Sequence, residues 1–126
     1  MTNLEDYGFV KSGNFYLENG KVDFDLNANS SKEAVYVITS DGVPMYIGKT
    51  NKTLKTRITG YKNPHESQKT NEKIKEKITE KLESGSEVGI WSLSPNQISY
   101  RGLELDMVRA LENPLIQKFD PEWNGR

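Results

Sequence analysis

Two tyrosines occupy comparable positions in two neighbouring runs of the chain that have the composition of β-strands. Tyr36 lies in EAVYVITS, and Tyr46 lies in VPMYIGKT, directly before Gly48 and Lys49. In an antiparallel hairpin, residues at suitable distances from the turn share one face, so two phenol oxygens could meet in one patch. Such a patch could orient or deprotonate water. An aromatic cross-strand pair that buries area is the simpler interpretation, and the spacing alone favours it.

An arginine, Arg57, follows on a segment with helical spacing. Its neighbours one turn away, Thr53 and Tyr61, are not acidic, so no carboxylate partner is available on the same ridge. A guanidinium group binds phosphate through two parallel hydrogen bonds, a geometry that lysine cannot copy. Phosphodiester hydrolysis needs such a cation, a metal ion and a proton acceptor for water.

The candidate proton acceptor is Tyr36, and Tyr46 is the candidate for positioning the water. A free phenol has a pKa of about 10, so it is protonated at neutral pH. We therefore expect cationic neighbours, such as Arg57, a lysine or the metal, to lower the pKa of Tyr36. Which of the two tyrosines loses its proton stays open at this point.

Positive charge is concentrated in one part of a chain whose net charge is −1. Residues 49–81 hold ten bases and four acids. A one-sided basic surface is what binding to nucleic-acid phosphates requires. We expect DNA contacts from Lys49, Lys55, Lys73 and Lys77. The competing interpretation is a lysine-rich helix that is simply solvated.

The elements that must position these residues can be located from turn and helix signals. Asn19-Gly20 and Asp41-Gly42 predict two β-hairpins, the second holding both tyrosines. Asn51 or Thr53 begins a helix that runs to Tyr61. A second helix is expected from about residue 70 to 84, a strand over 87–93, and a last helix over about 100–119 with a bend or break at Pro114.

This order predicts an α+β fold with a small three-stranded antiparallel sheet sandwiched by helices. We divide the chain into an N-terminal β-hairpin extension, residues 1–33, and one domain, residues 34–126. The first hairpin is expected to be an appendage. With 126 residues, the chain is long enough for a single domain with a real core.

Composition limits the chemistry. The chain has no cysteine and one histidine, His65, which excludes disulfides, cysteine nucleophiles and multi-histidine zinc sites. A metal site would therefore have oxygen ligands. No apolar run approaches the roughly 20 residues of a membrane span, and the N-terminus carries acids where a signal peptide carries bases. We expect a cytoplasmic protein that does not bind membranes.

Four pieces of the sequence, in order, resemble the GIY-YIG nuclease family. They are AVY at 34–36, YIG at 46–48, Arg57, and LENPLIQKFDPEWN at 111–124, and together they span roughly residues 34–124. Ala34-Val35 replace the Gly-Ile of the family signature. Many members have histidine where this chain has Tyr61, which we place among the residues that contact DNA.

The resemblance implies roles for two further residues. Glu112 stands where the family has a metal-binding glutamate, and one carboxylate completed by water and phosphate oxygens suits Mg²⁺, with Mn²⁺ as a substitute. Asn124 stands at the family's closing asparagine and is expected to tie the C-terminal segment to the tyrosine pair. An exposed helix glutamate is the other interpretation of Glu112.

The sequence therefore predicts a Mg²⁺-dependent endonuclease that hydrolyses double-stranded DNA. A non-catalytic DNA-binding module that uses the basic face of residues 49–81 is the alternative, and RNA cleavage is a third possibility. Because one such site nicks one strand, cutting both strands predicts a homo-oligomer, either a dimer or larger. The N-terminal hairpin, with Phe15, Leu17 and Phe24 to bury, could join the subunits or touch DNA.

Overall fold

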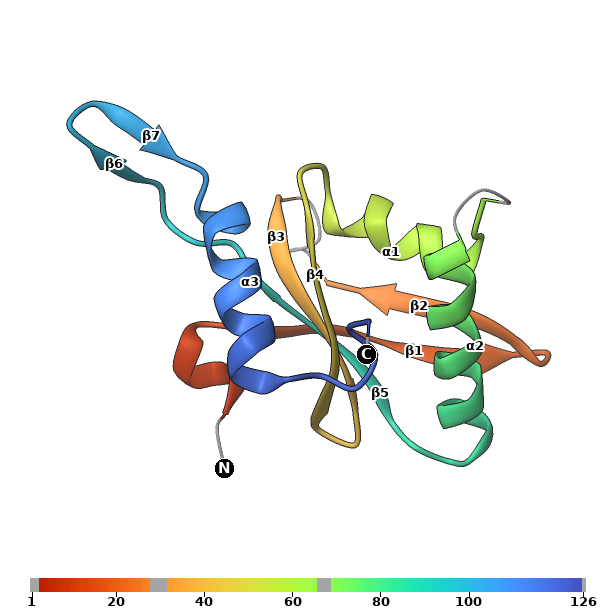
Figure 1. Cartoon of the computed structure of the whole chain (residues 1–126). Coiled ribbons are helices and arrows are strands. Elements are labelled where there is room, and N and C mark those ends of the chain that lie inside the picture. Colours follow the sequence, from red (N-terminus) through yellow and green to blue (C-terminus); the bar gives the residue numbers. More distant parts are fainter. Residues whose placement is uncertain (1–2, 28–31, 66–68, 126) are drawn as a thin grey trace.

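The computed structural model describes residues 3–27, 32–65 and 69–125 and has an α+β architecture, as the sequence predicts (Figure 1). Five antiparallel strands form the main sheet in the order β2-β1-β5-β3-β4. The strands are β1 (Val10–Glu18), β2 (Lys21–Leu26), β3 (Ala34–Ser40), β4 (Val43–Thr50) and β5 (Val88–Leu93). The helices are a short 3-10 helix η1 (Leu4–Tyr7), α1 (Leu54–Lys62), α2 (Lys69–Glu83) and α3 (Met107–Phe119).

The sheet has five strands and not the three that were predicted, because the N-terminal hairpin is part of it. The hairpin forms at Asn19 and Gly20, which both have positive φ. Strand β1 then pairs with β5 over Val10–Phe15, so the hairpin extends the sheet instead of hanging from it as an appendage. Phe15 and Val22 are buried in the same core cluster as the central strands. This burial explains why the hairpin joins the sheet.

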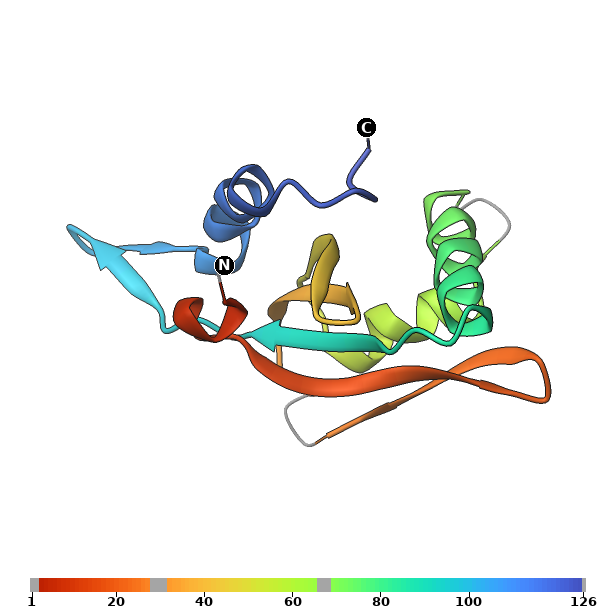
Figure 2. The same ribbon diagram turned by 90° about the horizontal axis from the view of Figure 1, so that it is seen from below.

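The β3–β4 hairpin lies between two helical layers (Figure 2). Alternate residues of a strand point to opposite faces. Tyr36 and Ile38 therefore pack with α1 and α2, whereas Val35 and Val37 pack with η1 and α3. The sheet thus has a core on each face, and its edge strand β4 runs between the helices of the two layers.

The helix boundaries agree with the sequence except at the start of α3. Thr53 caps α1 by accepting a hydrogen bond from the Thr56 N–H, and Gly85, with positive φ, follows the end of α2. Helix α3 begins at Met107, capped by Asp106. It continues through Pro114, so of the two expected alternatives, a bend or a break, the break does not occur.

Residues 98–105 form a separate two-stranded sheet where the sequence predicted the first turns of the last helix. Its strands are β6 (Ile98–Tyr100) and β7 (Leu103–Leu105). Arg101 and Gly102 form the turn between them, with φ of 52° and 84°. Two successive residues with positive φ favour a tight hairpin, and they are incompatible with an α-helix.

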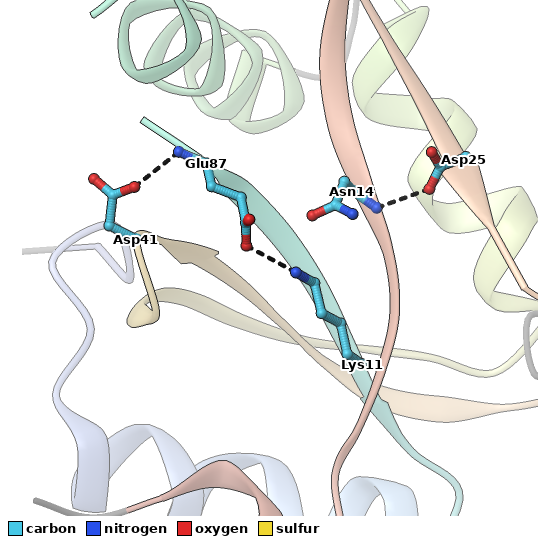
Figure 3. A network of polar contacts seen from close by, with 5 residues as sticks. All are labelled: Lys11, Asn14, Asp25, Asp41 and Glu87. Carbon is cyan, nitrogen blue, oxygen red and sulfur yellow. Dashed lines mark hydrogen bonds and ion pairs between the residues drawn. The ribbon is translucent and has the colours of Figure 1, made fainter. Parts of the chain in front are cut away.

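Polar contacts fix the first hairpin and the β3–β4 turn to the start of β5 (Figure 3). Lys11 forms an ion pair of 2.7 Å with Glu87. The Glu87 N–H donates to the Asp41 carboxylate at 2.8 Å, and the Asn14 N–H donates to the Asp25 carboxylate at 3.1 Å. The contacts of Glu87 with Lys11 and Asp41 join residues that are far apart in the sequence, whereas the Asn14–Asp25 contact lies within the first hairpin. Within the part of the chain that the structure describes, no helix is long and apolar enough to cross a membrane.

Candidate nuclease site

Three tyrosines from three elements form one cluster on the α1–α2 face of the sheet. Tyr36 comes from β3, Tyr46 from β4 and Tyr61 from α1, and each pair of ring centres is 6.3 Å apart. The Tyr36 and Tyr61 hydroxyls are 2.5 Å apart and share a hydrogen bond. Tyr36 and Tyr61 are completely buried, whereas Tyr46 is partly exposed. The two predicted tyrosines are therefore brought together, with Tyr46 on the side that solvent reaches.

The register of the hairpin explains the role of Gly48. Tyr36 lies opposite Gly48, and Tyr46 lies opposite Ile38, so the two tyrosines are diagonal neighbours and not a direct cross-strand pair. A Cβ atom on Gly48 would lie 2.5 Å from the Tyr36 hydroxyl oxygen and 2.6 Å from Cζ. Only glycine leaves room here for the Tyr36 phenol.

We expect Gly48→Ala to destabilise the fold by about 1–3 kcal/mol, the usual cost of overpacking a buried site. The added methyl group must displace a phenol that is fully buried and hydrogen-bonded to Tyr61. Urea unfolding followed by circular dichroism measures the effect.

Gly60→Ala is the control, because a Cβ at Gly60 meets first the Asn71 side-chain amide, at 3.3 Å. Alanine is also the better helix former by about 1 kcal/mol, so this variant should be as stable as the wild type or more so. Equal stability of Gly48→Ala and the wild type would contradict the packing described for Tyr36.

Arg57 closes the cluster from α1. Its Cζ atom lies 4.6 Å from the centre of the Tyr61 ring, and its Nη1 donates to the Asn71 side-chain oxygen at 3.2 Å. None of the ion pairs found among the described residues involves Arg57. As the sequence predicted, no acid lies one turn away on α1, and no carboxylate among the described residues pairs with the guanidinium, which leaves its charge available to an anion.

Asn71 contacts the candidate site but was not among the residues predicted from the sequence. It is buried on α2, and its side-chain oxygen accepts a hydrogen bond from Arg57. The sequence contains a signal for this residue, because position 71 lies on the same helical stripe as Ile74 and Ile78 but carries a polar amide. A buried amide on such a stripe indicates a specific hydrogen-bond partner.

Burial raises the pKa of Tyr36, and the Arg57 guanidinium acts in the opposite direction without overcoming it. Burial also raises the pKa of Tyr61, and the neighbouring Tyr36 and Tyr46 raise it further. The expectation that Arg57 lowers the pKa of Tyr36 below that of a free phenol is therefore wrong, since desolvation outweighs this cation. Both buried phenols are protonated at neutral pH.

Glu112 lies on α3, in the helical layer on the opposite face from the tyrosines, and reaches the edge of β4. Its Oε1 atom accepts a hydrogen bond from the Lys49 ammonium at 3.1 Å, and its side chain is 24% exposed. The described residues contain no group of three or more Asp, Glu or His side chains that could hold a metal ion. Among the described residues, a cation bound at Glu112 would thus find at most two such side chains, with water filling its other positions.

Lys49, near the end of β4, lines two of the hollows on the surface. It lines a hollow of about 420 Å³ together with Arg57 and Asn71. It also lines a second hollow of about 330 Å³ together with Arg109 and Asp106, at the start of α3. Lys49, whose ammonium bonds Glu112, therefore also lines the hollow in front of Arg57, although Glu112 itself lines neither hollow.

A third hollow, of about 480 Å³, holds most of the other predicted residues. Tyr46, Lys73, Lys77 and Asn124 line it, at the place where the C-terminal segment faces α2. Lys55 is exposed on α1 and is not among the residues that line these three hollows. Tyr61 was predicted to contact DNA, but it cannot do so directly, because the core encloses it.

Asn124 is bonded to the edge strand next to Tyr46. Its side-chain oxygen accepts from the Ile47 N–H, and its side-chain nitrogen donates to the Ile47 C=O, both at 2.8 Å. The Trp123 N–H also donates to the Met45 C=O at 2.8 Å. The C-terminal segment therefore occupies the open edge of β4 on both sides of Tyr46.

We expect Asn124→Ala to lower the free energy of unfolding by about 1–3 kcal/mol, because two hydrogen bonds to Ile47 are lost. The Ile47 amide should also exchange its hydrogen faster, as measured by NMR. Asn124→Asp keeps the acceptor for the Ile47 N–H, so its free energy of unfolding should lie between those of the wild type and Asn124→Ala. Unchanged exchange at Ile47 in Asn124→Ala would show that the side chain does not hold this edge.

Comparison with known proteins gives matches to nucleases. No protein-family model matches the chain. UvrABC system protein C of Fusobacterium nucleatum subsp. nucleatum is 29% identical over 106 residues, which are 83% of this chain. The aligned part is 14% of that relative, so the chain spans about one seventh of its length.

Solved nuclease structures have the same fold. A mutant of bacteriophage T4 EndoII matches with a TM-score of 0.76 and 24% identity over 95% of this chain and 93% of that one. The restriction endonuclease HPY188I in complex with product DNA matches with a TM-score of 0.57 and 16% identity over 94% and 79%. The GIY-YIG N-terminal endonuclease domain of UvrC from Thermotoga maritima, bound to magnesium as its catalytic divalent cation, matches with a TM-score of 0.51 and 26% identity over 77% and 88%. The chain therefore has the fold of the GIY-YIG nucleases, as its sequence suggested.

Proposed function

We propose that this chain is a divalent-metal-dependent DNA endonuclease that hydrolyses phosphodiester bonds. One observation carries the proposal. In a chain with the GIY-YIG nuclease fold, Arg57 packs on Tyr61, and the Tyr61 ring in turn contacts those of Tyr36 and Tyr46. A core aromatic pair needs no arginine, and Arg57 has no acidic partner among the described residues. Arg57 is half-buried, and removing part of a guanidinium from water without an opposite charge is costly, so an anionic ligand is the expected partner.

Arg57 and Lys49 bind the scissile phosphate in the hollow that both line. Arg57 supplies two parallel N–H donors, and its contacts with Tyr61 and Asn71 fix the plane of the guanidinium before DNA arrives. Donors that are already oriented stabilise the charge that develops on phosphate oxygens without rearranging during the reaction.

Glu112 holds the metal ion, for which we propose Mg²⁺ with Mn²⁺ as a substitute. The carboxylate fits such an ion, since it already attracts the Lys49 ammonium and one-quarter of the side chain is open to solvent. Mg²⁺ keeps several of its waters and needs only one or two carboxylates. When bound, the ion neutralises charge on the phosphate and lowers the pKa of water.

Tyr46 orients the attacking water, because it is the tyrosine of the cluster that solvent reaches. Tyr36 is buried, and its pKa is raised, so we assign it a positioning role in place of proton transfer. Its hydrogen bond with Tyr61 holds the two buried rings in place, and the Tyr46 ring packs against both of them. Asn124 holds the β4 backbone beside Tyr46.

The DNA strand continues along the hollow lined by Tyr46, Lys73 and Lys77. These lysines are exposed on α2 and contribute charge without base specificity, as phosphate contacts do. Lys55, exposed on α1, extends the same basic surface. The restriction endonuclease of similar fold is bound to product DNA, which supports DNA as the substrate.

Nicking of supercoiled plasmid tests the proposal. The wild type should convert supercoiled plasmid to the open circle with either Mg²⁺ or Mn²⁺. Excess EDTA should abolish the conversion with both metals. A labelled single-stranded RNA in parallel reactions should stay intact. Binding without nicking in either metal would support the non-catalytic DNA-binding module instead, and cleavage of RNA alone would change the substrate class.

A further inference from the structure

One of the hollows that Lys49 lines has no role in the proposed function. It has a volume of about 330 Å³ and lies between the end of β4 and the start of α3 (Figure 1). The residues that line it include Lys49, Asn51, Arg109, Glu33 and Asp106. We call it the α3 hollow.

The α3 hollow is a neighbour of the hollow in front of Arg57. Lys49 and Asn51 line both of them, so the two hollows meet at the end of β4. The hollow in front of Arg57 is the one assigned above to the scissile phosphate. Along each strand of DNA, one phosphate follows the next about every 3.4 Å of helix axis. A strand whose scissile phosphate lies at Arg57 therefore has a neighbouring phosphate within reach of the α3 hollow.

Arg109 is the side chain in the α3 hollow that suits such a phosphate. It is exposed and takes part in none of the ion pairs found among the described residues. A guanidinium group is always charged and binds phosphate through two parallel N–H donors. Exposed arginines without a partner are common on protein surfaces, so the argument depends on where this one lies, in a hollow that it shares with Lys49.

Helical geometry places Arg109 on the same side of α3 as Glu112. Val108 and Leu115 are buried in the core between α3 and the sheet. Arg109 and Glu112 are three residues apart, about 60° around the helix, and Cβ atoms at this spacing are about 5–6 Å from each other. A phosphate bound by Arg109 would therefore lie beside a metal ion bound by Glu112, as the phosphate next to the scissile one must.

The two acids that line the α3 hollow do not cancel its two bases. The Asp106 carboxylate accepts a hydrogen bond from the Arg109 backbone N–H at 3.1 Å and caps α3, where the positive end of the helix dipole partly balances its charge. Glu33 is exposed, and none of the ion pairs in the part of the chain that the structure describes includes it. Lys49 and Arg109 therefore face one acid whose charge is not balanced locally, which favours an anion.

We propose that the α3 hollow binds the phosphate group next to the scissile phosphate on the same DNA strand, and that Arg109 is the residue that binds it. This inference rests on the proposed nuclease function, because the hollow in front of Arg57 defines the scissile position. Arg109 does not touch the reacting atoms and is a positioning residue. Lys73 and Lys77 bind the strand from α2, and Arg109 binds it from α3, in the other helical layer.

The salt dependence of DNA binding tests the contact, because each phosphate contact contributes about 0.9 to the slope of log K against log salt concentration. Fluorescence anisotropy of a labelled duplex in EDTA, over about 50–200 mM salt, measures this slope. Arg109→Ala should bind more weakly, with a slope smaller in magnitude by about 1. Arg109→Lys keeps a positive charge and should keep the slope of the wild type. The loss in Arg109→Ala should be equal for duplexes of unrelated sequence, since phosphate contacts carry no sequence information.

Lys118→Ala is the matched control. It also removes one exposed base from α3, but Lys118 is nine residues from Arg109, about two and a half turns, and therefore lies on the opposite side of the helix. Its slope should equal that of the wild type. Circular dichroism and thermal unfolding should be alike for all these variants, because both side chains are exposed. An unchanged slope in Arg109→Ala, or an equal fall in Lys118→Ala, overturns the proposal.

A methylphosphonate group, which removes the charge of one phosphate, locates the contact. Cutting of a labelled duplex by the wild type first identifies a cleaved phosphate, and the group is then placed on each side of it in turn. On one side, it should raise the concentration of wild-type protein that gives half-maximal cutting. It should have no further effect on Arg109→Ala, because both changes remove the same contact. Additive effects of the two changes on both sides would overturn the placement of Arg109 next to the cut.

The inference and the proposed nuclease function fail separately. If the wild type does not nick plasmid but the salt slope falls in Arg109→Ala alone, the nuclease is overturned and Arg109 remains a phosphate contact. If the wild type nicks plasmid and the two slopes are equal, the phosphate site is overturned and the nuclease stands.

Discussion

Replacing Glu112 by glutamine is expected to lower Mg²⁺-dependent nicking at least 100-fold while DNA binding in EDTA stays within about threefold of the wild type. The variant keeps the size of the side chain but loses the charge that would hold the ion. A bound metal is worth several kcal/mol to the charge that develops in phosphodiester hydrolysis, and each 1.4 kcal/mol is a factor of ten in rate. Single-turnover cleavage of a labelled duplex measures the rate, and fluorescence anisotropy measures binding.

Glu87→Gln is the matched control. Like Glu112, Glu87 is a carboxylate in an ion pair with a lysine, Lys11, but this pair ties β1 to the start of β5. The variant should cleave at the wild-type rate. If the cleavage rate falls only in Glu112→Gln, the cause is the loss of the metal ligand and not the loss of an ion pair. If Glu112→Gln cleaves normally in Mg²⁺, Glu112 does not hold the ion.

The second large effect is expected for Arg57→Lys. We expect the single-turnover rate to fall by about 10²–10³, the usual loss when one oriented donor to developing charge is removed. Lysine keeps the positive charge but cannot present two parallel N–H groups or stack on the Tyr61 ring as the guanidinium does. DNA affinity in EDTA should change little, because the net charge of the surface is unchanged.

The stability of Arg57→Lys separates a chemical role from a structural one. Arg57 also bonds Asn71, so its loss could loosen the contact between α1 and α2. The Asn71→Ala variant removes the same hydrogen bond and keeps the guanidinium, and it should retain more activity than Arg57→Lys. Equal loss of activity and of stability in both variants would mean that Arg57 serves only to join the helices.

The parts of the fold that depend on short-range signals could be predicted from the sequence. Asn19-Gly20 and Asp41-Gly42 adopt positive φ at the turns of their hairpins, and Thr53 caps α1. The two tyrosines share one face because strand alternation and a turn of known position require it. Arg57 could also be anticipated, since its helical neighbours are not acidic.

The pairing of β1 with β5 could not be predicted in this way. Val10 pairs with Ser92, and Phe15 pairs with Val88. Neither strand contains a signal for the other, because the hydrogen bonds that join them are identical for any sequence. What decides the pairing is the need to bury Phe15 and Val22 under the helices, which depends on the completed fold.

The start of the last helix was predicted wrongly for a different reason. Leu103 has the correct spacing from Met107 and Leu111 to lie on one helical stripe, but it belongs to β7. The deciding feature is the Arg101-Gly102 turn, in which arginine adopts positive φ. Arginine rarely does so, and the sequence therefore gave a weak turn signal against a good helical spacing.

The chemistry of Tyr36 also depended on information that only the structure contains. Sequence neighbours suggested cations that would lower its pKa, but the phenol is fully buried and its pKa is raised. The same burial makes Tyr46 the tyrosine available to water. Likewise, the contact between Lys49 and Glu112 depends on where α3 crosses the edge of β4.

We propose that a carboxylate, a guanidinium and a tyrosine cluster from distant parts of the chain form one site for a metal ion and a phosphate. Paramagnetic broadening of NMR signals by substoichiometric Mn²⁺ tests it without relying on activity. The amide signals of Gly48 and Lys49 and the Nε–H signal of Arg57 should broaden first, and this broadening should disappear in Glu112→Gln. Broadening centred instead on the acidic N-terminal hairpin around Asp23 and Asp25, or broadening at Lys49 that persists in Glu112→Gln, would contradict the account.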